Sequence, residues 1–147
     1  MLSKSRLKSW LGRFWLAPCS AIEFVLLVPP QPKGRHRTAR GRTYTPAKTV
    51  AYEAAVKAAW LRACPDAPPW DLASWMRADI VFVVARMSQD VDNLAKAVLD
   101  ALNGAAYKDD SQVIELAVRK EPGSWPGARV RIEPAFLFPP LELAQSA

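Results

Sequence analysis

The segment Ala78–Ala85, with the sequence ADIVFVVA, constrains the fold most strongly because nearly all of its residues are apolar. A near-continuous apolar run of this kind is typical of a strand buried on both faces. We therefore expect a strand here, with other elements packed against each of its two faces.

A helix is predicted over Pro46–Ala63, since this stretch is rich in alanine and Pro65 follows it. Thr45 is the expected N-cap, and Pro46 stands at the first helical position, where its missing N–H costs nothing. One face of the helix carries recurring apolar residues, which are Val50, Ala54, Ala58 and Leu61.

The remaining elements are three strands, at Glu23–Val28, Val113–Lys120 and Arg129–Glu133, and a second helix at Asp90–Asn103. Residues 31–45 are expected to form a polar, basic loop. The order β-α-β-α-β-β predicts an α/β (α+β) fold, with two main helices packed against a mixed sheet of about four strands.

The chain of 147 residues fits one ordinary domain. We expect a basic extension over 1–20, the domain over 21–134 and a tail over 135–147. With two cysteines, Cys19 and Cys64, and no CxxC motif, the sequence argues against a zinc site or a disulfide framework. We therefore expect reduced thiols in a cytoplasm. No run of eighteen apolar residues is present, so we expect no membrane-spanning segment.

Charge is distributed unevenly along the chain. Residues 1–62 hold twelve basic and two acidic residues, a net charge of +10, whereas the remainder holds eight basic and twelve acidic residues, a net charge of −4. A basic front half suits a polyanion such as DNA. The acidic half would repel DNA unless its carboxylates hold divalent cations. Ordinary solvated surface charge is the alternative that composition leaves open.

The second predicted helix separates polar from apolar residues. On a helical wheel the polar quadrant contains Asp92, Lys96, Asp100 and Asn103, and the opposite side contains Leu94, Val98, Ala101 and Leu102. Asp90 lies just before the helix. Asp109 and Asp110 follow the turn at Gly104, and they can return to the helix only if the next strand runs alongside it.

This concentration of aspartates predicts a site for hydrolysis of phosphodiester bonds. Mg²⁺ neutralises developing negative charge and lowers the pKa of a bound water, so that the water can attack phosphorus. The ion prefers oxygen ligands and keeps several waters, so carboxylates from different segments suffice, and Mn²⁺ is a substitute. We take Asp90, Asp92 and Asp110 as candidate ligands and Asp100 and Asp109 as secondary candidates.

Each of these residues also has a structural alternative. Asp90 and Asp92 could cap the helix, although capping requires only one carboxylate. Lys96 could contact the scissile phosphate, or it could form an i,i+4 ion pair with Asp92 or Asp100, and helix geometry does not decide between the two.

The loop at 31–45 is a candidate DNA-binding segment. Its basic residues are Lys33, Arg35, Arg37, Arg40 and Arg42. Guanidinium groups bind phosphates through paired hydrogen bonds, and five cations without an acid would otherwise repel one another. A solubilising loop is the alternative. His36 is expected at the surface or against a phosphate, and Tyr44 and Tyr107 are candidates for stacking on an unpaired base.

The central motif D-x-D-N-L-x-K-A-x-x-D-A-L-N-G, at Asp90–Gly104, and the DD-x-Q at Asp109–Gln112 resemble the RusA family of Holliday-junction resolvases. Upstream, P-K-G-R-x-R, G-R-x-Y-T-P and T-x-x-Y-E resemble the same family, as does Lys120. The resemblance covers roughly residues 22–133. Such proteins are common on phages and prophages and act in DNA recombination and repair.

The resemblance implies that Asp90, Asp92 and Asp110 are the essential metal-binding acids and that Lys96 is the functional lysine. It also implies a homodimer that nicks opposed strands of a four-way junction with Mg²⁺. Two other hypotheses remain: a non-catalytic relative that binds branched DNA, and a nucleotide-sugar transferase that uses its DxD motif to hold a nucleotide diphosphate.

Overall fold

The computed structural model describes residues 21–135. The predicted extension at 1–20 and all but the first residue of the predicted tail lie outside this range. Among the described residues, no helix is both long enough and apolar enough to cross a membrane.

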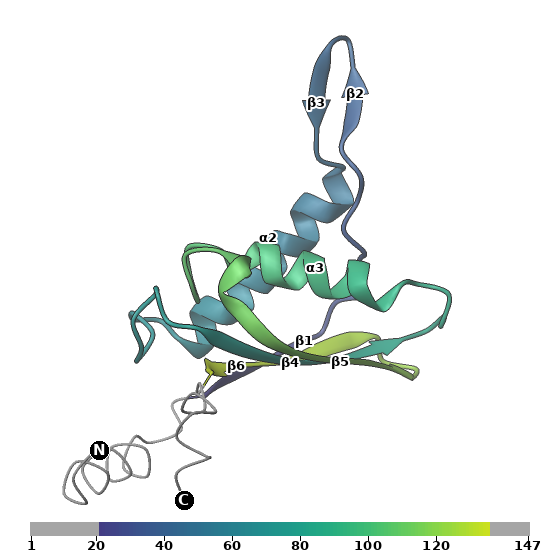
Figure 1. The fold of residues 1–147 in the computed structure, drawn as a ribbon. Coiled ribbons are helices and arrows are strands. Elements are labelled where there is room, and N and C mark those ends of the chain that lie inside the picture. The colour runs from purple at the N-terminus through teal and green to yellow at the C-terminus, as the bar shows by residue number, and fades with distance from the viewer. Residues whose placement is uncertain (1–20, 136–147) are drawn as a thin grey trace, which may run out of the picture.

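Four strands and two helices form two layers (Figure 1). The elements of the layers are β1 (Ile22–Leu26), α2 (Ala47–Ala63), β4 (Met76–Val84), α3 (Val91–Ala101), β5 (Val113–Pro122) and β6 (Gly127–Pro134). The sheet order is β1-β6-β4-β5, in which β6 is antiparallel to both of its neighbours and β5 is parallel to β4. The predicted α/β class, with two helices on a mixed four-stranded sheet, is confirmed.

Both helices lie on the same face of the sheet (Figure 1). The side chains of Ala78, Ile80, Phe82 and Val84 point toward the helices and are buried, whereas Val81 and Val83, on the other face, are only half-buried. The prediction that this strand is buried on both faces is therefore wrong. Its apolar run reflects a central position between β5 and β6, with one face covered by helices and the other covered by no element of residues 21–135.

The apolar face predicted for the first helix is also wrong. Val50, Ala54, Ala58 and Leu61 are exposed, and the buried residues are Thr49, Tyr52, Val56, Ala59 and Trp60. In an alanine-rich helix many faces look apolar, so the two large aromatic residues decide which face packs. Trp60 meets Phe24 of β1 edge-to-face, with ring centroids 6.1 Å apart.

The start of this helix differs by one position from the prediction. Pro46 is the N-cap, and its carbonyl oxygen accepts hydrogen bonds from the backbone N–H groups of Thr49 and Val50. The hydroxyl of Thr45 instead lies 3.4 Å from Nδ1 of His36. The helix thus begins without a side-chain cap.

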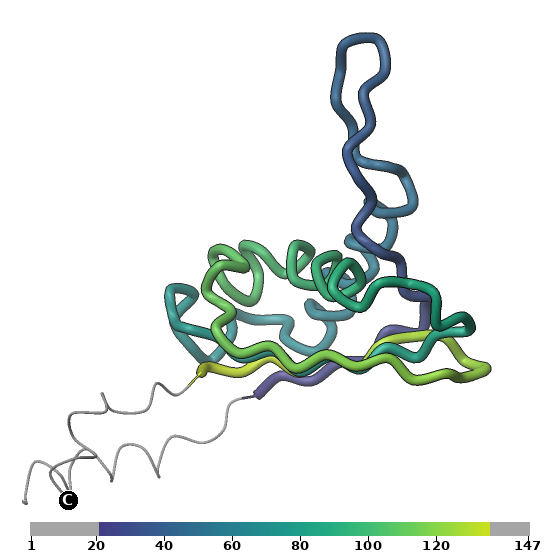
Figure 2. The backbone as a smooth tube through the Cα atoms, turned by 45° about the vertical axis from the view of Figure 1, so that its right-hand side comes forward, coloured from purple at the N-terminus to yellow at the C-terminus, as the bar shows by residue number. Residues whose placement is uncertain are grey.

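The segment predicted as a basic loop contains a β-hairpin, formed by β2 (Arg37–Ala39) and β3 (Arg42–Tyr44). Its two turn residues, Arg40 and Gly41, have φ values of 52° and 74°, and tight hairpin turns require such positive values. The hairpin projects well beyond the two layers (Figures 1 and 2). The sequence did not reveal it because arginine rarely occupies the first turn position.

We predict that Val56→Ala lowers the free energy of unfolding by about 2 kcal/mol, because it leaves a cavity between α2 and the sheet. Val50→Ala is the matched control, and it should change the stability by less than about 0.5 kcal/mol. Urea denaturation followed by circular dichroism measures both values. Equal losses of stability for the two variants would contradict the observed orientation of α2, in which Val56 is 0% and Val50 52% exposed.

Candidate active site

The parallel β4–α3–β5 unit brings the two acidic segments of the sequence together. Asp92 and Lys96 lie on α3, and Asp110 begins a short 3-10 helix, η1 (Asp110–Gln112), which leads directly into β5. These three side chains line one open hollow of about 410 Å³. Its other lining residues are Val91, Ala95, Leu99, Leu116 and Val118. The hollow is therefore lined by both charged and apolar side chains.

Lys96 connects the acids of this site. Its Nζ donates to Oδ1 of Asp100 at 3.1 Å and to Oδ2 of Asp110 at 3.4 Å. The hydrogen bond to Asp100 is the largest of the effects that raise the pKa of Lys96, so the ammonium stays charged. The i,i+4 ion pair with Asp100 is therefore present, and Lys96 also lines the hollow.

Asp90 occupies the N-cap position of α3. Its carbonyl oxygen accepts from the N–H of Leu94 at 3.1 Å. Its carboxylate accepts from the side-chain Nδ2 of Asn93 at 3.5 Å and does not bind the backbone N–H groups that begin the helix. The Asp90 carboxylate is not among the groups that line the hollow. The structure thus brings Asp92 and Asp110 to one hollow and leaves Asp90 at the beginning of the same helix.

Lys120 holds the loop that carries Asp90. From β5, its ammonium donates to the carbonyl oxygen of Met87 at 2.8 Å and to that of Gln89. The sequence indicated Lys120 only as a family feature, because its partners are backbone atoms more than thirty residues away.

Gln112 holds the segment that carries Asp110. Its Oε1 accepts from the N–H groups of Lys108 and Asp109, each at 3.0 Å, and its Nε2 donates to the carbonyl oxygens of Leu72 and Ser74 at 2.7 and 2.8 Å. This glutamine ends the DD-x-Q motif, but the motif alone indicated no role for it.

Asp109 and Asp110 are adjacent in sequence but differ in environment. Asp109 forms a capping box with Gln112, and hydrogen bonds from the hydroxyl and N–H of Ser111 hold the pKa of Asp109 below its usual value. Asp110 faces the hollow. Local hydrogen bonds therefore account for Asp109 and leave Asp110 available for chemistry.

Asp100 is shared between two lysines. Its Oδ2 lies 2.8 Å from Nζ of Lys33, and its Oδ1 accepts from Lys96. Burial would raise the pKa of Asp100, but the hydrogen bonds from Lys33 and Lys96 outweigh that effect and lower it. Lys33, expected among the DNA contacts, also binds Oε1 of Glu53 at 2.5 Å, and its side chain is 21% exposed.

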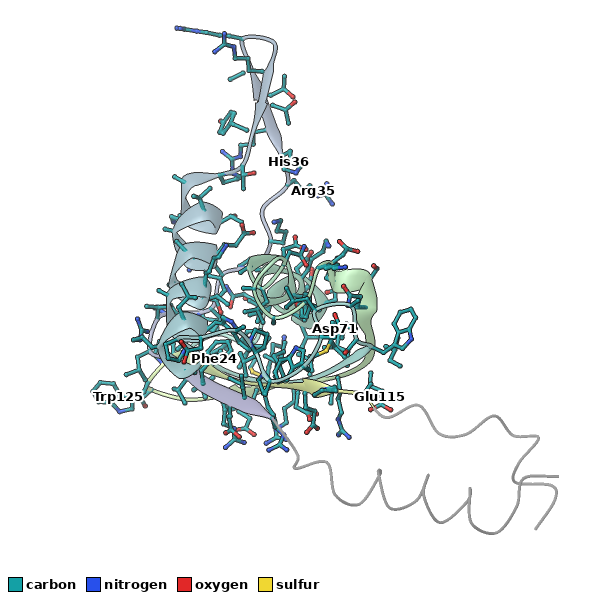
Figure 3. All side chains as sticks on the ribbon, turned by 90° about the vertical axis from the view of Figure 1, so that its left-hand side faces the viewer. Phe24, Arg35, His36, Asp71, Glu115 and Trp125 are labelled. Atoms are coloured by element: carbon teal, nitrogen blue, oxygen red, sulfur yellow. The ribbon has the colours of Figure 1, made fainter. Side chains whose placement is uncertain are left out.

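The four arginines of the predicted basic segment remain exposed on or beside the hairpin; they are Arg35, Arg37, Arg40 and Arg42. In Figure 3, Arg35 and His36 project from the base of the hairpin on the side away from α2. Tyr44, on β3, is 47% exposed and can meet a ligand. Tyr107 is fully buried and donates its hydroxyl to the carbonyl oxygen of Leu99 at 2.8 Å, so the prediction that it stacks on a base is wrong.

The acids suit a hydrated divalent cation better than a fully protein-bound one. Within residues 21–135, no three or more His, Cys, Asp or Glu side chains are gathered so that they could hold a metal ion. Mg²⁺ needs only one or two carboxylates, because it keeps several of its waters. Asp92 and Asp110, which share an open hollow, fit that requirement.

Comparisons with known proteins relate the chain to a nuclease family. The family model described as "Endodeoxyribonuclease RusA" matches residues 28–133, a range that includes the hairpin, α3 and η1. A curated protein of Bacillus subtilis (strain 168), described as "Uncharacterized protein YqaN", is 54% identical over 43 residues. That alignment covers 29% of this chain and 30% of the relative, so the chain spans less than a third of that protein's length.

We predict that Gln112→Ala lowers the free energy of unfolding by about 2 kcal/mol, because it removes four hydrogen bonds and leaves backbone groups without partners. Gln31→Ala is the matched control, since Gln31 lines a separate hollow beside α2. Thermal denaturation of both variants tests the expectation. Equal melting temperatures for Gln112→Ala and the wild type would contradict the role assigned to Gln112.

Proposed function

This chain belongs to the RusA family of endodeoxyribonucleases, and from that membership we propose that it cuts four-way DNA junctions with Mg²⁺ or Mn²⁺. The observation that supports this most directly is the convergence of Asp92, Lys96 and Asp110, from two segments, on one hollow. A hairpin with exposed arginines projects beyond the helical layer that contains α3 (Figure 1).

Each side chain has a distinct proposed task. Asp92 and Asp110 would hold the cation. Asp90, which the family resemblance implies as a third acidic ligand, lies outside their hollow at the N-cap of the same helix. The bound cation supplies charge neutralisation and a water of lowered pKa. Lys96, kept protonated by Asp100, would place its charge beside the scissile phosphate and stabilise the negative charge that builds up there.

The hairpin would bind the DNA backbone. Guanidinium groups pair with phosphate oxygens through two hydrogen bonds, and such contacts orient a duplex without reading its bases. We propose that Arg35, Arg37, Arg40 and Arg42 make these contacts. Tyr44, exposed on the same hairpin, could stack on an unpaired base at the junction centre.

A homodimer completes the proposal. A four-way junction has two-fold symmetry, and a protein with matching symmetry makes paired cuts natural. One chain offers a single candidate acid site among the described residues, so two chains are needed to nick two opposed strands.

We predict that Asp92→Asn lowers the rate of Mg²⁺-dependent nicking of a synthetic four-way junction by about 10²-fold or more, while junction binding is retained. EDTA should abolish wild-type nicking, and excess Mg²⁺ should restore it. Asp66→Asn, in an exposed loop, is the control and should cut at the wild-type rate.

Two results would contradict this proposal. Tight junction binding without cleavage in either Mg²⁺ or Mn²⁺ would identify a non-catalytic DNA-binding relative. Equal cleavage rates on four-way junction, flap, single strand and linear duplex would retain the nuclease but reject the preference for junctions.

We also predict that replacing Arg37, Arg40 and Arg42 together by Gln weakens junction binding. The slope of log K against log salt should become flatter by about 0.9 for each B-DNA phosphate that the variant no longer neutralises. Filter binding between low and moderate salt measures this slope. Arg62→Gln, in the last turn of α2, is the matched control; if the triple variant and the control share one slope, the hairpin does not bind phosphates.

A further inference from the structure

The base of the hairpin is attached to both helices at Lys33 and Gly34. We propose that Lys33 is a positioning residue, not a phosphate ligand, and that it sets the place of the arginine hairpin relative to the catalytic helix. This inference rests on the proposed nuclease function. It explains how the DNA-binding hairpin keeps a fixed position relative to the acids of the active site.

The ammonium of Lys33 is already engaged by protein carboxylates. Oε1 of Glu53 on α2 lies 2.5 Å from Nζ, and Oδ2 of Asp100 on α3 lies 2.8 Å from it. The ammonium thus has two carboxylate partners within the protein, one on each helix. Lys33 therefore differs from Arg35 and Arg37, which follow it on the chain and are exposed.

Backbone contacts attach the same two residues to the same two helices. The N–H of Lys33 donates to the carbonyl oxygen of Asn93 on α3 at 2.9 Å, and the N–H of Gly34 donates to Oγ1 of Thr49 on α2 at 3.2 Å. The approach to α2 is close, since a Cβ on Gly34 would lie 2.7 Å from that oxygen. The side-chain and backbone contacts thus form a clamp at the foot of the hairpin.

Asp100 joins this clamp to the active site. One oxygen of its carboxylate binds Lys33, and the other binds Lys96, which in turn reaches Asp110. The ion pairs form one series, in which each side chain contacts the next: Glu53, Lys33, Asp100, Lys96 and Asp110. A shift of the hairpin base would therefore disturb the carboxylate that orients Lys96.

Stability alone does not explain this arrangement. Partly buried ion pairs lose much of their Coulombic gain to desolvation, and their best-attested use is to select one geometry among several. Geometry matters here, because a displacement of about 1 Å in a bound substrate can lower a reaction rate by about 10²-fold. Arginines that hold the DNA backbone can deliver one phosphate to Asp92 and Asp110 only if their distance from α3 is constant.

Lys33→Met and Glu53→Gln, in the full-length chain, separate positioning from direct phosphate binding. If Lys33 positions the hairpin, both variants should speed hydrogen exchange of the Lys33 and Gly34 amides in the free protein. Both should also lower single-turnover junction cleavage by about 10²-fold and leave the salt slope of junction binding unchanged. Lys33→Arg, which retains the charge, should recover part of the rate, and Lys57→Met, an exposed lysine on α2, is the control.

A direct phosphate contact gives the opposite pattern. Lys33→Met would then flatten the salt slope by about 0.9, and Glu53→Gln would keep or raise affinity and cleavage, because it frees the ammonium. That pattern, or unchanged amide exchange in both variants, would overturn the positioning role. A wild-type protein that cuts no DNA would instead overturn the proposed function, and the positioning proposal with it, whatever the exchange rates show.

Discussion

The parallel pairing of β4 with β5 is the interaction on which the candidate site depends. Because β5 runs beside β4 in the same direction, the chain must cross the sheet between them, and α3 makes that crossing. The residues just before β5 then lie next to the polar face of α3. Asp110 therefore shares a hollow with Asp92 and Lys96, although nearly twenty residues separate the two aspartates along the chain.

Two long polar side chains hold the segments that carry the acids, through hydrogen bonds to backbone atoms of those segments. Lys120 fixes the loop before Asp90, and Gln112 fixes the turn before Asp110. Neither side chain needs to contact a substrate to affect the site. An aspartate on an irregular segment keeps its position only if the segment itself is held in place. The helix of the site is held differently, by the burial of Leu94, Val98 and Leu102 in the hydrophobic core.

The basic and acidic halves of the chain meet in one ion-pair network rather than occupying opposite ends. Charge counting suggested that every cation of residues 33–42 serves DNA, yet Lys33 is bound by Glu53 and Asp100. The arginines that follow it on the chain are exposed to solvent. Sequence reasoning could not separate these cations, because a carboxylate partner sixty-seven positions away leaves no mark on local spacing.

The sequence by itself determined the succession of the four strands and two helices of the main layers and the polar face of α3, since hydrophobic period is a property of neighbouring residues. It also indicated Asp92 and Lys96 through the spacing of one long motif, and Asp110 through the DD-x-Q motif that follows. Only the tertiary structure decided that β4 is covered on one face, that Tyr52 and Trp60 choose the buried face of α2, and that Tyr107 is in the core. Those outcomes depend on which distant segments pack together. The order of strands in the sheet determines this packing, and the residue pattern within any one strand does not.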